Sequence, residues 1–426
     1  MMNGDTRYIS STLEIDNSSF TPSSLLQLSN ADGIYFKNAE VTIAGFGCAF
    51  TLTLDQGDIS YSDKVLQALK SVEVIDEIEQ PGSGPLFIGA IRFDRSKSSF
   101  LRVPQTTIVL RSDGKAWITH VAEGTKQLPT RDSIIEEINQ CIIATSKPTD
   151  EPNSFILTSQ PEKQTWIEQV NHGLHHIRLN SIEKLVLSRQ VLVEADNNLN
   201  TAIILERLSH LYPTCTIFHI SGFVGASPEL LISRKESHLR SLPLAGTVAR
   251  SGNDDVDTLL VQSMLESTKE RNEHAITASW VGETLAKFCS ALSIPKSPSV
   301  ISLRNVSHLA TDIRGVIDSD IHDPGILDIV RVLHPTPAIA GYPVSKSIEI
   351  LSAIELYPRE FYSGPVGWCD RNGNGDFVVG IRSAFIQENT ARLYAGVGIV
   401  SNSDPIRELA ETQLKLQAVL SAIVRP

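Results

Sequence analysis

The sequence predicts an α+β protein built mainly from antiparallel sheets. Many short apolar segments follow one another directly, and few are separated by a helical segment. Turn residues join neighbouring segments: the stretch TTIVLRSDGKAWITHV (106–121) predicts a hairpin around Ser-Asp-Gly. Both observations favour largely antiparallel sheets over a doubly wound parallel fold.

The first third of the chain is weakly patterned. Besides the hairpin, it contains a second clear strand, LFIGAIRFD (86–94), and a predicted helix over 132–145. The polar, proline-bearing segment SKPTDEPNSF (146–155) then has the composition of a linker. It is either a domain boundary or a surface loop, because the N-terminal strands can join the same sheets as later ones.

The rest of the chain has sharper elements. Helical spacing predicts one helix over 160–178 and a longer one over 257–289. Alternating apolar residues predict strands over 184–195, 216–225, 229–235 and 238–247. A three-strand meander is predicted from 363–370, 376–385 and 391–400. A closing helix begins at Asp404-Pro405, where an N-cap residue precedes a proline in the first helical position.

The composition argues against several classes of protein. With 37 basic and 49 acidic residues the net charge is −12, so there is no basic field to neutralise nucleic-acid phosphates. No apolar run reaches the length of a membrane span, and the first ten residues do not have the features of a signal peptide. Five dispersed cysteines suit reduced thiols. We therefore expect a cytoplasmic protein that binds neither nucleic acid nor membrane.

Two predicted helices carry carboxylates on one face. At about 100° per residue, each set falls within an arc of roughly 60°: Glu266, Glu270 and Glu273 on the long helix, and Glu408, Glu411 and Lys415 on the closing helix. Each face is either solvated, with ordinary helical ion pairs, or one half of a cation site. Carboxylate oxygens suit Mg²⁺ better than zinc, and the nearest zinc-type ligand, His274, lies about 80° away from the arc.

Other polar residues allow a structural and a chemical interpretation. Lys184 opens a strand as a solubilising group or, in a dry site, as a general base. Glu229 in GASPELL is a turn residue or, in an apolar pocket, a general acid. The glycines of PLAGT and AGVG form plain turns or bring backbone N–H groups to an anion. Arg382 needs a carboxylate or solvent, and both His308 and His334 have structural roles by default.

Nine motifs, in this order, resemble those of the chorismate-utilising enzymes. They are KLVLSR, GASPELL, PLAGT, KERNEH, HPTPAIAG, REFYSGPVGW, GIRSAF, AGVGIV and SDP-x-x-E-x-x-E-x-x-x-K. The resemblance covers roughly residues 155 to 426 and includes the anthranilate synthase large subunits, the isochorismate synthases and the salicylate synthases. FIGAIRFD in addition resembles the isochorismate synthases of catechol-siderophore pathways, which lead to 2,3-dihydroxybenzoate.

The resemblance implies an anthranilate synthase component I-like fold, with two large stacked antiparallel sheets flanked by helices. The expected organisation is a single domain over 1–426. Residues 1–150 would be a variable part that adds strands to the sheets, and residues 155–426 would be the catalytic core. The active site would lie in a cleft where Mg²⁺ holds the ring carboxylate of chorismate.

The resemblance also implies residue roles. The direct metal ligands would be Glu273 and Glu411, and the carboxylates that hold the metal's waters would be Glu270 and Glu408. The substrate-binding residues would be Gly246, Thr247, His308, Tyr362, Arg382, Gly398 and Lys415. Lys184 matches the lysine that activates water, and Glu229 the acid that protonates the departing C4 hydroxyl. Glu266 matches no role.

Lys184 favours water over ammonia as the nucleophile, and Ala245 stands where aminodeoxychorismate synthases carry a nucleophilic lysine. The expected activity is therefore isochorismate synthase, with a downstream isochorismatase removing the product. Salicylate synthase is the main alternative, and Ala338 and Ala340 weigh weakly against it. Less favoured are a menaquinone-pathway isochorismate synthase, anthranilate formation and a catalytically silent binding protein.

Overall fold

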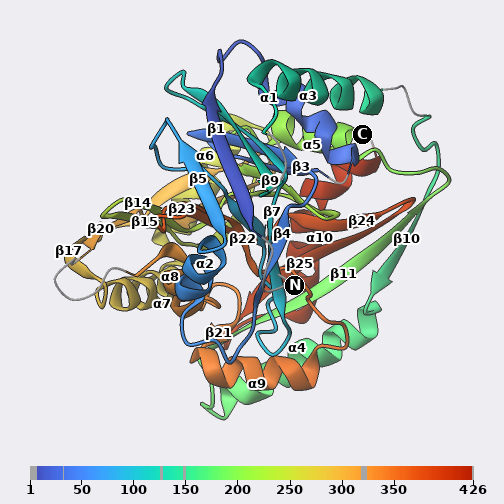
Figure 1. Ribbon diagram of the computed structural model, residues 1–426. Helices are drawn as coiled ribbons and strands as arrows, with labels where there is room; N and C mark the ends of the chain where they lie inside the picture. Colours follow the sequence, from blue (N-terminus) through green and yellow to red (C-terminus); the bar gives the residue numbers. More distant parts are fainter. Residues whose placement is uncertain (1–6, 32, 125–127, 147–149, 318–323, 425–426) are drawn as a thin grey trace.

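The computed structural model describes residues 7–31, 33–124, 128–146, 150–317 and 324–424 (Figure 1). Strands of these residues form two large sheets and one small sheet, and helices cover the outer faces of the large sheets. Every described strand pair is antiparallel except β1 with β5, so the predicted α+β class is confirmed.

The largest sheet, sheet A, has thirteen strands within the described residues. In spatial order they are β10 (Phe155–Gln160), β11 (Lys184–Ala195), β25 (Thr390–Ile399), β24 (Ser383–Gln387), β13 (Phe223–Ser227), β12 (Thr216–Ile220), β2 (Ile34–Lys37), β3 (Val41–Phe46), β8 (Thr106–Arg111), β9 (Ala116–Glu123), β1 (Tyr8–Glu14) and β5 (Val72–Asp76). The short β21 (Gly341–Tyr342) pairs with the beginning of β11.

The two other sheets are smaller. Sheet B contains β17 (Cys289–Ser293), β20 (Ile313–Ile317), β15 (His238–Leu242), β14 (Leu230–Lys235), β23 (Gly375–Val379), β22 (Pro365–Cys369), β6 (Phe87–Ala90), β7 (Ser99–Val103) and β4 (Phe50–Leu54). Sheet C contains β16 (Leu244–Ala249), β19 (Val306–Ala310) and β18 (Ser299–Ser302).

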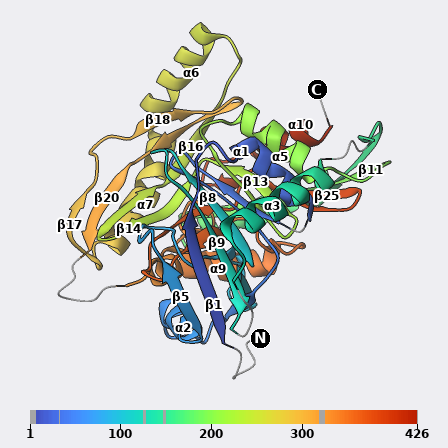
Figure 2. The same cartoon turned by 45° about the horizontal axis from the view of Figure 1, so that its top comes forward.

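The helices lie outside the sheets (Figures 1 and 2). They are α1 (Pro22–Leu25), the 3₁₀ helix η1 (Leu26–Ala31), α2 (Tyr61–Leu69), α3 (Arg131–Thr145), α4 (Lys163–Arg178), α5 (Thr201–Leu211), α6 (Asp254–Glu266), α7 (Thr268–Leu285), α8 (Ile326–Leu333), α9 (Val344–Ile354) and α10 (Pro405–Val424). No helix of the described residues is long and apolar enough to cross a membrane.

Apolar side chains fill the space between sheets A and B. Phe36 and Phe218 of sheet A belong to the same buried cluster as Ile88 and Val366 of sheet B. Further clusters join the outer face of sheet A to α3, α5 and α10, and the outer face of sheet B to α2, α7 and α8. Alternating strand residues thus bury one face against the opposite sheet and the other against helices.

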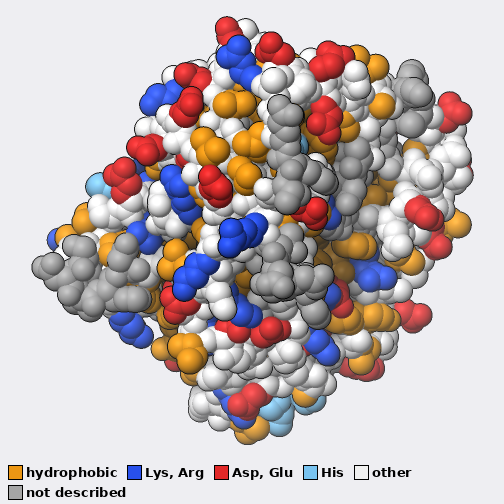
Figure 3. Space-filling model, viewed as in Figure 1, with side chains coloured by type: hydrophobic (Ala, Val, Ile, Leu, Met, Phe, Trp, Pro, Cys, Tyr) orange, Lys and Arg blue, Asp and Glu red, His pale blue; other side chains and the backbone are white. Residues whose placement is uncertain are grey.

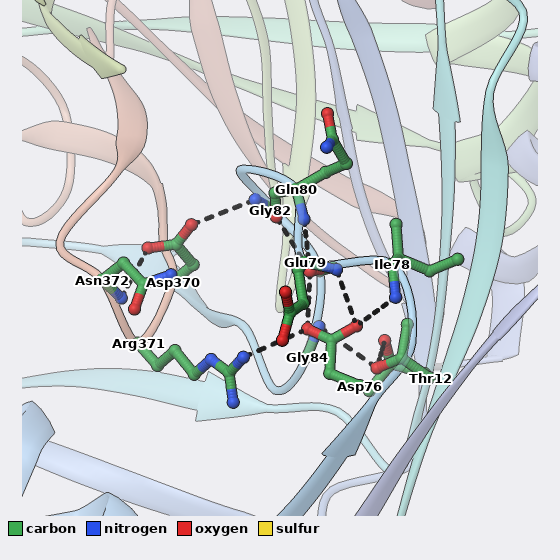
Figure 4. Close-up of polar contacts among 12 residues, drawn as sticks. Thr12, Asp76, Ile78, Glu79, Gln80, Gly82, Gly84, Asp370, Arg371 and Asn372 are labelled. Atoms are coloured by element: carbon green, nitrogen blue, oxygen red, sulfur yellow. Dashed lines mark hydrogen bonds and ion pairs between the residues drawn. The ribbon is translucent and has the colours of Figure 1, made fainter. Parts of the chain in front are cut away.

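Both large sheets combine N-terminal and C-terminal strands. β2 pairs with β12 in sheet A, and β6 pairs with β22 in sheet B. A buried polar junction adds to this connection (Figure 4): the Asp370 carboxylate accepts a hydrogen bond from the N–H of Gly82, 3.0 Å away, and Arg371 lies 3.6 Å from Asp76. Asp76 also accepts from the N–H of Ile78. The turn after β22 is therefore held against the loop after β5.

The structure confirms the predicted hairpin, the strand over 184–195, the helix ending at residue 145 and the closing helix. Four predicted elements are wrong in their continuity. The strand over 216–225 is a hairpin that turns at Ser221 and Gly222, both at positive φ. The strand over 238–247 is broken at Pro243. The long helix is two helices, because Ser267 is extended and caps α7.

The fourth correction concerns the meander. Residues 376–385 do not form one strand: β23 ends in sheet B and β24 begins in sheet A. Arg382, at φ 51°, lies in the bend between them. The predicted three-strand meander is therefore two hairpins, β22–β23 and β24–β25, in different sheets.

Candidate active site

A cleft opens where the chain passes from one sheet to another. Three such crossovers line it: residues 227–229 between β13 and β14, the segment around Pro243 between β15 and β16, and residues 380–382 between β23 and β24. The first and third run side by side, because the N–H of Val379 donates to the carbonyl of Glu229 at 3.0 Å and that of Ala226 donates to the carbonyl of Arg382 at 3.1 Å.

Eleven of the thirteen predicted site residues line this cleft. They are Glu229, Gly246, Thr247, Glu270, Glu273, His308, Tyr362, Arg382, Gly398, Glu411 and Lys415. The twelfth, Lys184, contacts Glu273 from β11, and the thirteenth, Glu408, lies one helical turn before Glu411 on α10. The motifs thus converge although they are spread over more than 200 residues of sequence.

Lys184 and Glu273 form a buried ion pair. The Lys184 Nζ lies 2.9 Å from the Glu273 Oε1, and the lysine side chain is 1% exposed. Burial raises the pKa of Glu273, but Lys184, Lys415 and Lys269 together lower it by more, so the net shift is downward. A Cβ atom at Gly398 would lie 2.7 Å from this carboxylate and 3.0 Å from the Lys184 Cε. Gly398 is therefore the residue that leaves space for the pair.

Glu229 is the most perturbed carboxyl group of the cleft. It is 4% exposed, and burial raises its pKa to about 7, against smaller lowering effects of the Leu244 N–H and the Lys184 charge. A carboxyl group with this pKa is half protonated near neutral pH and can donate a proton there.

The remaining carboxylates are close to one another and to lysines. Burial, with repulsion from Glu411, raises the pKa of Glu408 to about 6. Burial, with repulsion from Glu273 and Glu411, also raises the pKa of Glu270. The N–H of Thr247 donates to the Glu270 Oε2 at 3.0 Å, and the Lys415 Nζ lies 2.7 Å from the Glu411 Oε1. The backbone of the PLAGT turn therefore binds an anion, and here that anion is Glu270.

The donor set fits a hard divalent cation in its chemistry. Glu270 and Glu273 of α7 and Glu411 of α10 line the cleft, and Glu408 lies one turn before Glu411. Burial and repulsion between these carboxylates raise the pKa values of Glu270 and Glu408. Within the described ranges, no group of three or more His, Cys, Asp or Glu side chains is arranged so that it could hold a metal ion. Lys184 and Lys415 each pair with one of these carboxylates, so a cation would have to compete with both ammonium groups.

His308 orients Arg382. The His308 Nδ1 lies 3.2 Å from the carbonyl oxygen of Gly246, which can only accept, so this nitrogen carries the proton. The Nε2 then accepts from the Arg382 Nη2 at 3.0 Å. Burial, followed by the charge of Arg382, lowers the pKa of His308 well below its usual value. His308 is thus neutral and acts as an acceptor for Arg382.

Arg382 and Tyr362 are suited to an anionic ligand. Arg382 is 7% exposed, and its Nε has no hydrogen-bond partner among the described residues. Tyr362 is buried and stacks on Tyr394, with ring centroids 5.2 Å apart. A guanidinium N–H without a partner on a cleft wall favours a carboxylate ligand, because a buried donor is costly when it stays unpaired.

Two residues singled out in the sequence lie away from the cleft. Glu266 ends α6 and accepts from the Gln262 side chain. His334 is buried behind the cleft, where burial lowers its pKa to about 3 and the carbonyl of Ser363 lies 3.3 Å from its Nε2. Sequence reasoning missed Lys269, which lines the cleft and lies 3.8 Å from Glu270. Its place in KERNEH, directly before Glu270, was the available signal.

A larger cavity, of about 670 Å³, shares only Pro228 with the cleft. It lies between residues of sheet A, such as Thr216, and residues of sheet B, such as Arg240 and Arg314. The paired lysines and glutamates of the motifs are all outside it, so we assign the chemistry to the smaller cleft.

Relatives with known folds support the architecture. A solved protein from Bacillus anthracis, provisionally described as the 2,3-dihydroxybenzoate-specific isochorismate synthase DhbC, is 30% identical, with a TM-score of 0.77 over 94% of this chain and 98% of that one. Anthranilate synthase component I from Streptococcus pneumoniae TIGR4 shares the fold, with a TM-score of 0.72 at 19% identity over 89% of this chain and 92% of that one. The predicted component I-like fold is confirmed.

Curated relatives agree. Isochorismate synthase DhbC of Bacillus subtilis (strain 168) is 33% identical over 82% of this chain and 84% of its own length. Isochorismate synthase EntC of Escherichia coli (strain K12) is 31% identical over 79% of this chain and 81% of its own length. The family profile described as chorismate binding enzyme matches residues 2–424. The chain therefore belongs to the family of chorismate-binding enzymes.

Proposed function

We propose that the protein is an isochorismate synthase, which adds water at C2 of chorismate and releases the C4 hydroxyl. The observation that carries this proposal is the convergence of buried Lys184 and buried Glu229 with Glu270, Glu273 and Glu411 at one cleft. The relatives named isochorismate synthase, at 30 to 33% identity, support the same reaction.

Glu273 and Glu411 would hold Mg²⁺ directly, and Glu270 and Glu408 would hold its waters. The bound ion would supply positive charge that offsets repulsion between the substrate carboxylates and the glutamates. Arg382 and Tyr362, which both line the cleft, would bind the enolpyruvyl carboxylate. Gly246, Thr247, Gly398 and Lys415 would line the anionic end of the substrate.

In the reaction, Lys184 first loses the proton that it carries in its ion pair with Glu273. Its neutral amine then takes a proton from the water whose oxygen bonds to C2. The ring double bonds shift, and the C4–O bond breaks as Glu229 donates its proton, so that the hydroxyl leaves as water. One water enters and one leaves, and the two side chains then exchange their protons with solvent. Each proton transfer contributes roughly 10²–10⁴-fold to the rate. The base role requires Lys184 to give up its contact with Glu273.

Product analysis tests the proposal. The full-length protein is incubated with chorismate and MgCl₂, and the products are separated by chromatography. Isochorismate is the expected product. Salicylate with pyruvate would support the salicylate synthase alternative, and anthranilate in the presence of ammonium would support the amination alternative. If chorismate is bound but unchanged, the protein is a binding protein and the proposal fails.

The pathway is part of the proposal. The relatives DhbC and EntC support a siderophore role, in which an isochorismatase consumes the product in the cytoplasm. The isochorismate synthase MenF of Bacillus subtilis (strain 168) is nearly as similar, at 30% identity. The segment FIGAIRFD, which resembles the siderophore enzymes, contributes β6 to the inner part of sheet B and not to the cleft. Adding a purified isochorismatase to the assay should increase chorismate consumption, because the two hydroxyl positions are nearly equivalent and the equilibrium constant should be of order one.

A further inference from the structure

The edge of β11 next to the cleft lacks a backbone partner in its middle. Lys184 and Leu185 pair with β21, and residues from Gln190 onward pair with β10. Between these two segments, the N–H of Val186 donates to the carbonyl of Ala340, at 3.0 Å, and no strand of the described residues continues the ladder on this side. Side chains take the place of the missing strand.

Arg359 and Glu355 occupy this gap. The Glu355 Oε1 accepts from the N–H of Ser188 at 2.8 Å, and the Arg359 Nη2 donates to the carbonyl of Val186 at 2.5 Å. The two side chains also form a bidentate pair, with the Arg359 Nε 2.8 Å from one Glu355 oxygen and the Nη2 2.6 Å from the other. Both are buried, with side chains 2% and 9% exposed.

The same guanidinium reaches a second wall of the cleft. The Arg359 Nη1 donates to the carbonyl of Ile339 at 2.7 Å, and Ile339 and Val186 both line the cleft. The Phe93 ring lies 4.3 Å from the Arg359 Cζ and supports the guanidinium by cation–π contact. The carbonyl of Arg359 accepts from the N–H of Tyr362 at 2.9 Å. One residue therefore contacts three segments that shape the cleft.

We propose that Arg359 and Glu355 are a positioning pair that sets the strand of Lys184 at its working distance from the wall formed by Ile339. The pair touches no reacting atom and acts through the backbone of Val186 and Ser188. A lysine at position 359 would keep the charge but cannot bond Val186, Ile339 and Glu355 at once, because only the planar guanidinium offers this fork. This inference rests on the proposed function of Lys184.

The test compares Arg359→Lys and Glu355→Gln with wild-type protein, well below the unfolding temperature of each variant. We expect kcat to fall 10- to 100-fold in Arg359→Lys and several-fold in Glu355→Gln, since displacements near 1 Å can cost about 10²-fold. KM for chorismate should change less than threefold, because Arg382 and the Arg359 carbonyl that holds Tyr362 remain. Mg²⁺ affinity, measured by calorimetry without substrate, should also remain, because the side-chain hydrogen bonds described for the pair go to Val186, Ser188 and Ile339 and not to α7 or α10.

The matched control is the exposed pair of Lys346 and Glu349 on α9, whose Lys346→Ala variant should match wild type in all three measurements. Wild-type kcat in folded Arg359→Lys, or in Glu355→Gln if the first variant does not fold, would overturn the inference. A loss of Mg²⁺ affinity in proportion to the loss of kcat would also overturn the inference, since it would indicate that the whole active site has lost its structure. If wild-type protein makes a different product from chorismate, the proposed function fails, and the comparison of kcat for that product still tests the positioning pair.

Discussion

Replacing Glu229 with glutamine should make the protein more stable and nearly inactive. The native carboxyl group has a pKa of about 7 because it is buried, against 4.5 in its ordinary state. As pH rises from about 4.5 to about 7, the unfolded chain loses this proton while the folded chain retains it, so the group lowers the stability of the fold progressively. The full cost, reached above pH 7, is about 3 kcal/mol from the difference in pKa. A neutral glutamine amide carries no charge and so does not lose stability in this way, and its oxygen can still accept from the N–H of Leu244.

The same pKa sets the activity. A general acid works in its protonated form, and the protonated fraction of Glu229 falls about tenfold per pH unit above pH 7. At a fixed protonation state of Lys184, kcat of the wild type should fall by the same factor. Glu229→Gln should lose roughly 10²–10⁴-fold in kcat, because the amide has no proton to give. Product chromatography at pH 6 to 9 measures kcat of the wild type and of Glu229→Gln. Denaturant unfolding at pH 5 and pH 8 measures the difference in stability between the two proteins. A fully active variant, or a stability difference that does not grow with pH, would refute the assignment.

Three further changes test other parts of the cleft. Lys184→Met should keep the fold and lose about 10²–10⁴-fold in kcat, because the base is removed; substantial residual turnover by chromatography would assign the base elsewhere. Gly398→Ala should sharply reduce kcat, because the new Cβ would lie 2.7 Å from the Glu273 carboxylate and separate it from Lys184. The control is Gly57→Ala, which should leave kcat unchanged because no atom beyond the neighbouring residues lies within 4 Å of the added Cβ. Chelation by EDTA should abolish activity, and added Mg²⁺ should restore it. Mg²⁺ should also raise the unfolding midpoint of the wild type but not that of Glu273→Gln. Full activity in EDTA would exclude a required metal.

The face of the protein shown in Figure 3 carries side chains of both charges. Acidic and basic side chains are interspersed on the face in Figure 3, and the basic side chains of the described residues form no continuous field there.

Local sequence patterns were sufficient for several elements. The strand over 184–195 and the closing helix were predicted correctly because alternation, an N-cap and a following proline are local signals. The spacing of Glu270 with Glu273 and of Glu408 with Glu411 is also local, so each pair could be placed on one helix face before any fold was known.

The sheet crossovers were decided only by the tertiary structure. An alternating apolar run has the same pattern whether it stays in one sheet or bends into another, so the runs through Pro243 and Arg382 were predicted as single strands. These bends, with the one at Glu229, place Glu229 and Arg382 at the cleft. Contacts such as Lys184 with Glu273 also depend on the fold, because a sequence pattern contains no information on which distant segments meet across a sheet. The sequence by itself determined the fold class, the local elements and the residue types of the site, whereas long-range packing determined where those residues meet.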